Sequence, residues 1–265
     1  MLQTKLKVLD LFSGIGGFSL GLESTGFFET IAFVEKDEFC QKVLKKNFNN
    51  IPIEGDIRNV KGDKYKADVV TGGFPCQPFS VAGKRKGTDD DRYLWDETIR
   101  VVRECKPKWF IGENVEGLVN IQEGMVLRQV QNDLEKEGFE VQCIIIPASG
   151  IGAWHQRKRI WIIGCNVSNS NTRFGIRENE EIQTRGNTST NGSKDVSNSD
   201  SNFTKQQTWW QTQSDLCGVP NGVSYELDKD RANRIKALGN SIVPQIAREL
   251  GLAIMEAEKD RKSVV

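Results

Sequence analysis

Short apolar runs alternate with amphipathic stretches along the first 165 residues of the chain. The apolar runs have the length and the Val, Ile, Leu and Phe content of buried strands. They fall at 6–12, 30–35, 67–73, 108–113, 141–148 and 159–165. The stretches between them repeat apolar residues at helical spacing, at 17–25, 38–47, 94–105 and 122–137. Strands that alternate with helices predict an α/β fold, a Rossmann-like doubly wound sheet in which most strands are parallel.

The alternation stops after residue 165, where the chain becomes polar. Residues 166–208 are rich in Asn, Ser and Thr, a composition that cannot bury much apolar surface. Helical spacing returns near the end of the chain, with Pro244 in the first turn and apolar residues at Ile242, Ile246, Leu250 and Ile254. We therefore expect a main α/β domain at 1–165, a small irregular region at 166–234, and a helical part at 235–265 that returns to the main domain.

Composition narrows the class of protein without giving its function. Lys plus Arg and Asp plus Glu number 36 each, so net charge indicates no nucleic-acid partner, although basic residues cluster at 83–87 and 155–159. No run approaches the ~18 apolar residues that span a bilayer, and the N-terminus is too polar for a signal peptide, so we expect a cytoplasmic protein. The six cysteines include no Cys-x-x-Cys pair and His155 is the single histidine, which argues against a zinc site or a disulfide framework.

A glycine-rich turn directly follows the first predicted strand. Gly14, Gly16 and Gly17 let the backbone turn sharply and leave amide donors near the next helix. Glu35 ends the second predicted strand, about 20 residues further on, where Rossmann-like folds hold ribose hydroxyls. Asp56 stands where a third strand would end. This succession predicts a site for a nucleoside-containing cofactor, although the Gly-x-Gly-Gly spacing disfavours a dinucleotide.

A single thiol, Cys76, stands between two prolines at the end of the run 67–73. By itself this pattern fits an inert cysteine in a stiff turn as well as a nucleophile whose direction the prolines fix. Glu113 ends the strand that we expect beside it, and Arg157 and Arg159 enter a later strand on one face, because alternate residues of a strand point the same way. A carboxyl group and two guanidinium groups near a thiol indicate an active site.

Five motifs occur in a fixed order along the chain: DLFSGIGGF (10–18), GGFPCQPFS (72–80), GENVEGL (112–118), HQRKR (155–159) and ALGNSIVPQIA (237–247). In this order they resemble the motifs of the C5-cytosine-specific DNA methyltransferases. The resemblance covers residues 6–165 and about 218–257, with His155 where the family usually has Gln and Trp154 where it usually has Pro. It implies an enzyme dependent on S-adenosyl-L-methionine that flips a cytosine out of duplex DNA and methylates its carbon 5.

The resemblance implies a role for each catalytic candidate. Cys76 would add as a thiolate to carbon 6 of cytosine, which makes carbon 5 nucleophilic enough to accept a methyl group. Glu113 would contact ring nitrogen 3 and the exocyclic amine of the base. Arg159 would contact the cytosine carbonyl oxygen, and Arg157 would brace the loop that carries Cys76.

The same resemblance outlines the cofactor pocket. Phe12 would lie on the adenine face, and the glycine turn along the methionine part. Glu35 would hold the ribose hydroxyls, Asp56 the adenine amine, and Ile57 the apolar surround of the adenine. Three further residues would complete the pocket: Leu94, Asn240 and Ser241. No metal is expected.

Double-stranded DNA is the implied macromolecular partner. The residues expected to contact it lie in the loop around and after the thiol: Gln77, Ser80, Lys84, Arg85 and Lys86. The region 166–234 would serve as a short target-recognition region and linker, in which Trp209 and Trp210 would supply groove contacts, so we expect a compact enzyme of phage-like or orphan type. We expect a monomer without a membrane partner, accompanied by a cognate endonuclease if it acts in restriction–modification.

Three alternatives stay open at this point. A tRNA cytosine-5 methyltransferase would use the same motifs, but the chain has SNFT at 201–204 where that branch carries Cys-Phe-Thr. A catalytically silent DNA-binding regulator would need neither Cys76 nor Glu113. A thiol-redox protein would need a resolving cysteine, and Cys76 has no such neighbour in the sequence. The basic run 83–87 also fits a solvated surface.

Overall fold

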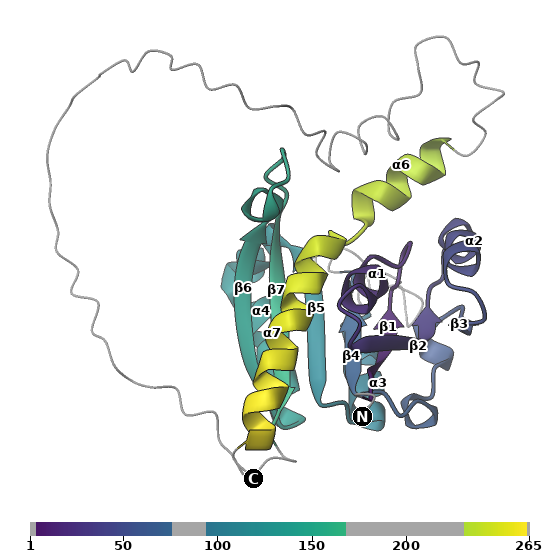
Figure 1. Ribbon diagram of the computed structural model, residues 1–265. Helices are drawn as coiled ribbons and strands as arrows, with labels where there is room; N and C mark the ends of the chain where they lie inside the picture. The colour runs from purple at the N-terminus through teal and green to yellow at the C-terminus, as the bar shows by residue number, and fades with distance from the viewer. Residues whose placement is uncertain (1–3, 76–93, 168–230, 264–265) are drawn as a thin grey trace, which may run out of the picture.

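The computed structural model of the chain describes residues 4–75, 94–167 and 231–263 (Figure 1). In this part of the chain the strands form one seven-stranded sheet in the order β3-β2-β1-β4-β5-β7-β6. Strands β1 to β5 pair in parallel, whereas β7 pairs antiparallel with both β5 and β6. The predicted α/β sheet with mostly parallel strands is confirmed. The strands are β1 (Leu6–Leu11), β2 (Phe28–Val34), β3 (Ile53–Glu54), β4 (Val69–Gly72), β5 (Trp109–Val115), β6 (Phe139–Pro147) and β7 (Lys158–Asn166).

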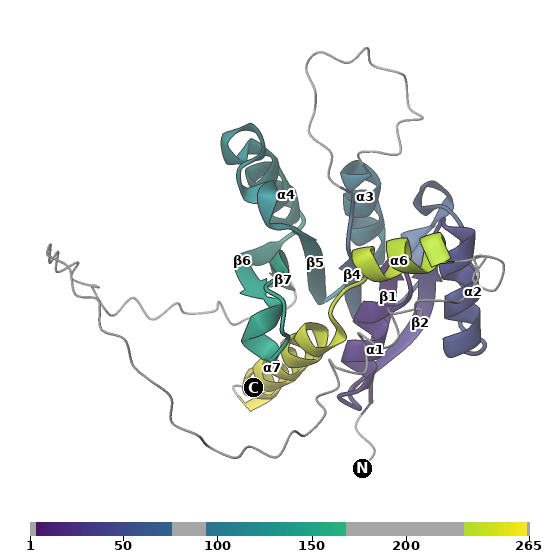
Figure 2. The ribbon, with the colours of Figure 1, turned by 90° about the horizontal axis from the view of Figure 1, so that it is seen from above.

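Helices cover both faces of the sheet, as in a doubly wound fold (Figure 2). Helices α3 and α4 pack on one face, where Trp95 and Val130 belong to one cluster of buried side chains. Helices α1 and α7 pack on the other face, where Phe18 and Leu250 belong to a second cluster. Among the described residues no helix is long and apolar enough to cross a membrane. The helices are α1 (Gly17–Glu23), α2 (Glu38–Asn47), α3 (Trp95–Cys105), α4 (Met125–Lys136), α6 (Arg231–Asn240) and α7 (Pro244–Ser263).

Two glycines on α1 let the start of α7 approach it closely. A Cβ atom at Gly17 would lie 2.7 Å from the carbonyl oxygen of Ile242, and one at Gly21 would lie 2.2 Å from the carbonyl oxygen of Pro244. Both distances are shorter than a van der Waals contact, so these positions require glycine for packing. The connection between α6 and α7 lies near the C-terminal end of the chain. The close approach brings it next to the glycine turn that follows β1.

The sheet topology gathers the expected site residues at one edge. Because β1, β2, β4 and β5 are parallel, their carboxyl ends lie at the same edge, and the antiparallel β7 begins there. Strands β2 and β3 lie on one side of β1, and the next strand, β4, lies on the other side. The strand order therefore reverses at β1. In open α/β sheets, ligands bind outside the carboxyl ends of the strands at such a reversal.

Candidate active site

A cavity of about 520 Å³ opens at this carboxyl edge. Its volume falls within the ~300–1,000 Å³ of ordinary ligand pockets. The wall combines the ends of β1, β2, β4 and β5, the beginning of β7, and helix α6. The residues that line it are Phe12, Gly14, Glu35, Asp37, Cys40, Gly73, Phe74, Pro75, Glu113, Asn114, Val115, Arg157, Arg159, Lys236, Ala237 and Asn240. Seven of these sixteen residues are among those expected from the sequence, namely Phe12, Gly14, Glu35, Glu113, Arg157, Arg159 and Asn240.

Glu113, near the end of β5, is the buried carboxyl group of the cavity, with 9% of the residue exposed. Its Oε1 lies 3.0 Å from Nε of Arg159, which enters from the neighbouring strand β7. Burial raises the pKa of Glu113, while the positive charges of Arg159 and Arg157 oppose the rise. A raised pKa makes a carboxyl group easier to protonate, and the protonated form can donate to a bound ligand.

Arg157 connects the beginning of β7 to the end of the chain. Its Nη1 donates to the carbonyl oxygen of Gly239 at 2.7 Å, and its Nη2 to that of Ser241 at 2.8 Å. Arg157 itself has a φ of 24°, outside the regions that L residues favour, so the loop is strained where it enters the strand. Both arginines line the cavity, and in the described residues Arg157 fixes the connection between α6 and α7.

Asn114 is a site residue to which the sequence assigned no role, although it lies in the GENVEGL motif. Its Nδ2 donates to the carbonyl oxygen of Phe74 at 2.9 Å, and its Oδ1 accepts from the N–H of Val115 at 2.9 Å. The side chain is buried, so losing either bond would leave a polar group unpaired. Asn114 thus holds the backbone two residues before Cys76. Its place directly after Glu113, at the polar end of a buried strand, was the available signal.

The glycine turn and Glu35 form the other end of the cavity. Glu35 accepts the N–H of Gly14 on Oε2 and that of Asp37 on Oε1, each at 2.7 Å. Burial raises the pKa of Glu35. Gly14 has a φ of +54°, and no atom lies within 4 Å of the place where its Cβ would stand. Phe12 also has a positive φ of 51°. The turn therefore leaves open space beside backbone amides, a carboxylate and an aromatic ring.

Six expected cofactor residues do not line this cavity in the described part of the chain. Gly16 and Gly17 make room for packing instead, since a Cβ at Gly16 would lie 2.6 Å from the ring of Phe48. Asp56 caps the 3₁₀ turn η1 (Ile57–Asn59), with Oδ1 accepting from the N–H of Arg58 at 3.0 Å. Ile57 is a buried core residue, Leu94 is the N-cap of α3, and the carbonyl oxygen of Ser241 accepts from Arg157.

An ion pair between distant segments closes one side of the cavity. Nζ of Lys236 on α6 lies 3.2 Å from Oδ2 of Asp37. Asp37 also caps α2, because its Oδ1 accepts from the N–H of Phe39 at 2.9 Å. These two residues are 199 positions apart, so no local sequence pattern pairs them. The contact joins α6 to the beginning of α2 at the cavity wall.

The remaining expected residues lie outside the described part of the chain. They are Cys76, Gln77, Ser80, Lys84, Arg85, Lys86, Trp209 and Trp210. The described backbone ends at Pro75, on the cavity wall, so Cys76 follows directly after a residue of the site.

Comparison with known proteins gives a consistent result. The profile of the C-5 cytosine-specific DNA methylase family matches residues 6–218. Type II methyltransferase M1.ScrFI of Lactococcus lactis subsp. cremoris is 40% identical over 162 residues, which are 60% of this chain and 41% of that protein. Type II methyltransferase M.HhaI of Haemophilus parahaemolyticus is 38% identical over 162 residues, 60% of this chain and 49% of that protein. The chain thus spans about half the length of these relatives.

Solved structures are similar as well. A chain from an E. coli prophage, described as a DNA modification methyltransferase, is 29% identical, with a TM-score of 0.54 over 62% of this chain and 47% of that one. A DNMT2 mutant of Spodoptera frugiperda, 23% identical, has a TM-score of 0.56 over 64% of this chain and 53% of that one. The second likeness concerns the fold alone.

Proposed function

Because the chain belongs to the family of C-5 cytosine-specific DNA methylases, we propose that it transfers a methyl group to carbon 5 of cytosine in duplex DNA. The observation that carries the proposal is the buried Glu113 paired with Arg159, in a cavity that also contains the glycine turn. A base bound at Glu113 and Arg159 and a methyl donor bound at the glycine turn would meet within one cavity. The type II methyltransferases among its relatives support DNA as the substrate.

S-adenosyl-L-methionine is the proposed methyl donor, and the residues present fit it. Gly14 leaves room where a Cβ would stand, and the two carboxyl oxygens of Glu35, with about four lone-pair sites, can accept from hydroxyl groups as well as from backbone N–H groups. Phe12 offers an aromatic surface on the same wall. When bound, this cofactor supplies an electrophilic methyl group. We propose that Glu35 holds its ribose hydroxyls and that the turn at Gly14 accommodates its methionine part.

Cys76 is the proposed nucleophile toward the base. Its thiolate forms a bond to carbon 6 of the flipped cytosine, and electron density moves to carbon 5, which takes the methyl group. Loss of the carbon 5 proton and of the thiolate then restores the aromatic ring. Asn114 fixes the backbone that leads to Cys76 through the carbonyl oxygen of Phe74. This contact lets the strand β5 set the direction from which the thiol approaches.

Glu113 and Arg159 are the proposed partners of the base. Glu113 with its raised pKa would donate a proton to ring nitrogen 3, which withdraws electron density from the ring as the thiolate adds. Arg159 would hold the Glu113 side chain and donate to the cytosine carbonyl oxygen. Arg157 would keep the α6–α7 connection in place over the same cavity.

We propose that residues 1–165 form the catalytic domain, that 166–234 contain a short target-recognition region, and that 235–265 return to the catalytic domain as a compact enzyme requires. Loop residues from Gln77 to Lys86 would contact DNA, and the chain would act as a monomer in the cytoplasm. The type II methyltransferases among its relatives support the proposal that a cognate restriction endonuclease accompanies it.

Methyl transfer to DNA tests the proposal. Purified protein is incubated with tritiated S-adenosyl-L-methionine and either duplex DNA or tRNA, and the modified DNA is then sequenced after bisulfite treatment. We expect label in DNA and protection of cytosines at a fixed sequence. Label in tRNA alone would favour the RNA enzyme, and no label in either with cofactor bound would favour the silent regulator. The variant Cys76→Ser is the control, and it should bind cofactor without turnover.

A further inference from the structure

One arginine of α3 fastens a turn that carries two of the expected cofactor contacts. We propose that Arg100 is a positioning residue for the adenosine end of the cofactor pocket. It fixes the backbone of turn η1 and, through that turn, Asp56 and Ile57. The inference rests on the proposed function, since it takes the bound group to be S-adenosyl-L-methionine.

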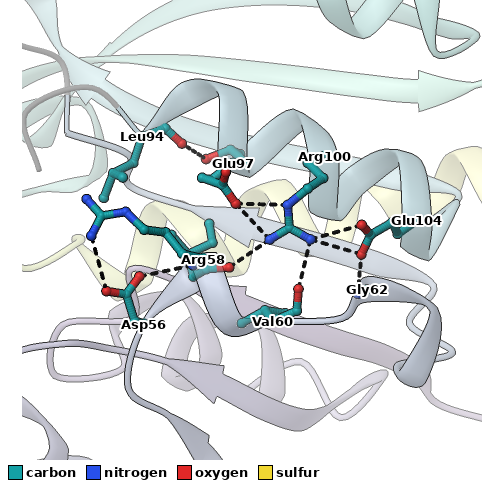
Figure 3. A network of polar contacts seen from close by, with 10 residues as sticks. Asp56, Arg58, Val60, Gly62, Leu94, Glu97, Arg100 and Glu104 are labelled. Atoms are coloured by element: carbon teal, nitrogen blue, oxygen red, sulfur yellow. Dashed lines mark hydrogen bonds and ion pairs between the residues drawn. The ribbon is translucent and has the colours of Figure 1, made fainter. Parts of the chain in front are cut away.

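The guanidinium group of Arg100 donates to both ends of this turn (Figure 3). Its Nη2 lies 2.9 Å from the carbonyl oxygen of Ile57, and its Nη1 lies 2.8 Å from that of Val60. The carbonyl oxygen of Ile57 accepts from the N–H of Val60 as well, at 3.1 Å, and Val60 ends the turn, where a cation is favourable. Arg100 supplies hydrogen bonds and positive charge at this place.

Two carboxylates of the same helix hold the guanidinium group in its orientation. Nε of Arg100 donates to Oε2 of Glu97 at 2.8 Å, and Nη1 donates to Oε1 of Glu104 at 2.9 Å. Oε2 of Glu104 in turn accepts the N–H of Gly62 at 2.7 Å. The planar fork of arginine donates in several fixed directions at once, which a lysine ammonium cannot reproduce. Arg100 therefore acts as a rigid link between α3 and residues 57–62.

This link determines where the expected adenosine contacts stand. Asp56 is ordered by the turn itself, since its Oδ1 accepts from the N–H of Arg58 and its carbonyl oxygen accepts from the N–H of Asn59. None of the expected contacts Asp56, Ile57 and Leu94 lines the cavity itself. Ile57, only 2% exposed, belongs to the buried cluster against which Leu94 and the cavity residue Phe12 pack. Leu94 begins the helix that carries Arg100. The three expected contacts thus belong to two segments that Arg100 joins, so a shift of the turn would move Asp56 relative to Leu94.

If Arg100 contributed to stability alone, its removal would not change whether the pocket prefers a ligand with adenine or one with hypoxanthine. Asp56 is the expected acceptor for the exocyclic amine of adenine, a group that hypoxanthine lacks. The ratio of affinities for S-adenosylhomocysteine and S-inosylhomocysteine therefore reports the position of Asp56. If Arg100 sets that position, its removal should reduce this ratio as well as the affinity.

Isothermal titration calorimetry with these two compounds tests the inference on the full chain. We expect wild type to prefer the adenosyl compound, and R100Q to bind it about tenfold more weakly, the scale of a lost charged hydrogen bond. Binding of the inosyl compound should change little, and R100K should give intermediate values. The matched control is R103Q on the same helix, because the 60% exposed Arg103 side chain forms its ion pair with Glu137, at 2.8 Å, and not with turn η1. Both dissociation constants of R103Q should stay at wild-type values.

Two results would overturn the role of Arg100 while leaving the proposed function in place. One is a folded R100Q that prefers the adenosyl compound as strongly as wild type does. The other is an equal loss of affinity for both compounds, which would limit the role of Arg100 to stability. If R100Q does not fold, R100K gives the same comparison. Failure of the wild-type protein to bind either compound would instead overturn the cofactor assignment, and the inference with it.

Discussion

At the scale of single residues, Asn114 connects strand β5 to the backbone that precedes Cys76. We expect Asn114→Ala to lower the rate of methyl transfer at saturating substrates by roughly 10- to 100-fold, since small misplacements of reacting groups are that costly. The dissociation constant of S-adenosylhomocysteine should not change, because Asn114 contacts Phe74 and Val115 rather than the glycine turn. Steady-state kinetics and calorimetry measure the two quantities. Asn120→Ala, a change at an exposed residue, serves as the control. Wild-type turnover in Asn114→Ala would show that Asn114 does not position the reacting groups.

A second single-residue effect concerns Asp10, which is fully buried in β1. Its carboxylate oxygens accept from Oγ1 of Thr71 at 2.6 Å and from Oγ of Ser19 at 3.0 Å, yet burial raises its pKa from 3.8 to about 7. Because the folded value lies above the unfolded value, the neutral form is favoured by folding. The contribution of Asp10 to stability is therefore complete below pH ~3.8 and is lost as the pH rises toward ~7.

The variant Asp10→Asn isolates this contribution, since an amide does not titrate. A tenfold change in proton affinity corresponds to about 1.4 kcal/mol. The free energy of unfolding of wild type, relative to the variant, should therefore fall by a few kcal/mol between pH 4 and pH 8. Urea denaturation at a series of pH values measures it. A difference that stays constant over this range would contradict the raised pKa.

At the scale of elements, the contact between α1 and α7 depends on glycine. Alanine normally favours a helix over glycine by about 1 kcal/mol. At Gly21, however, a Cβ would stand 2.2 Å from the carbonyl oxygen of Pro244, which belongs to the backbone and cannot rotate away. We expect Gly21→Ala to destabilise the protein by about 1–3 kcal/mol, as overpacked cores do. Gly117→Ala, where nothing lies within 4 Å, should change the free energy of unfolding by less than about 0.5 kcal/mol. Equal melting temperatures for the two variants would disprove the close approach.

Most elements followed from periodicity, although helix α6 was not predicted as a helix separate from α7. Apolar runs and helical spacing predicted each strand from β1 to β7 except the two-residue β3, whose end the sequence marked only by Asp56. The reversed direction of β7 did not follow, because an apolar run has the same pattern in a parallel and an antiparallel strand. Asn114 escaped notice because its partner is a backbone carbonyl, which carries no side-chain signature.

At the scale of the whole molecule, the site is assembled from both ends of the chain. Lys236 meets Asp37, and Arg157 meets Gly239 and Ser241, over separations of 199, 82 and 84 positions. Contacts of this range depend on how the sheet brings segments together, so the sequence named Asn240 as a cofactor residue through a family motif and missed Lys236. The candidate site therefore forms only when distant segments of the chain fold together.

Covalent trapping tests the central claim, that Cys76 attacks cytosine in duplex DNA. Duplex DNA in which every cytosine is 5-fluorocytosine supplies the target at any recognition sequence. After addition to carbon 6 and methylation, a fluorine at carbon 5 cannot leave as a proton does, so the thiol stays bonded. With S-adenosyl-L-methionine present, we predict a denaturation-resistant protein–DNA adduct whose peptide mass locates the bond at Cys76, and no adduct with Cys76→Ser. Methylation of ordinary duplex DNA without this adduct, or an adduct at another cysteine, would contradict the account.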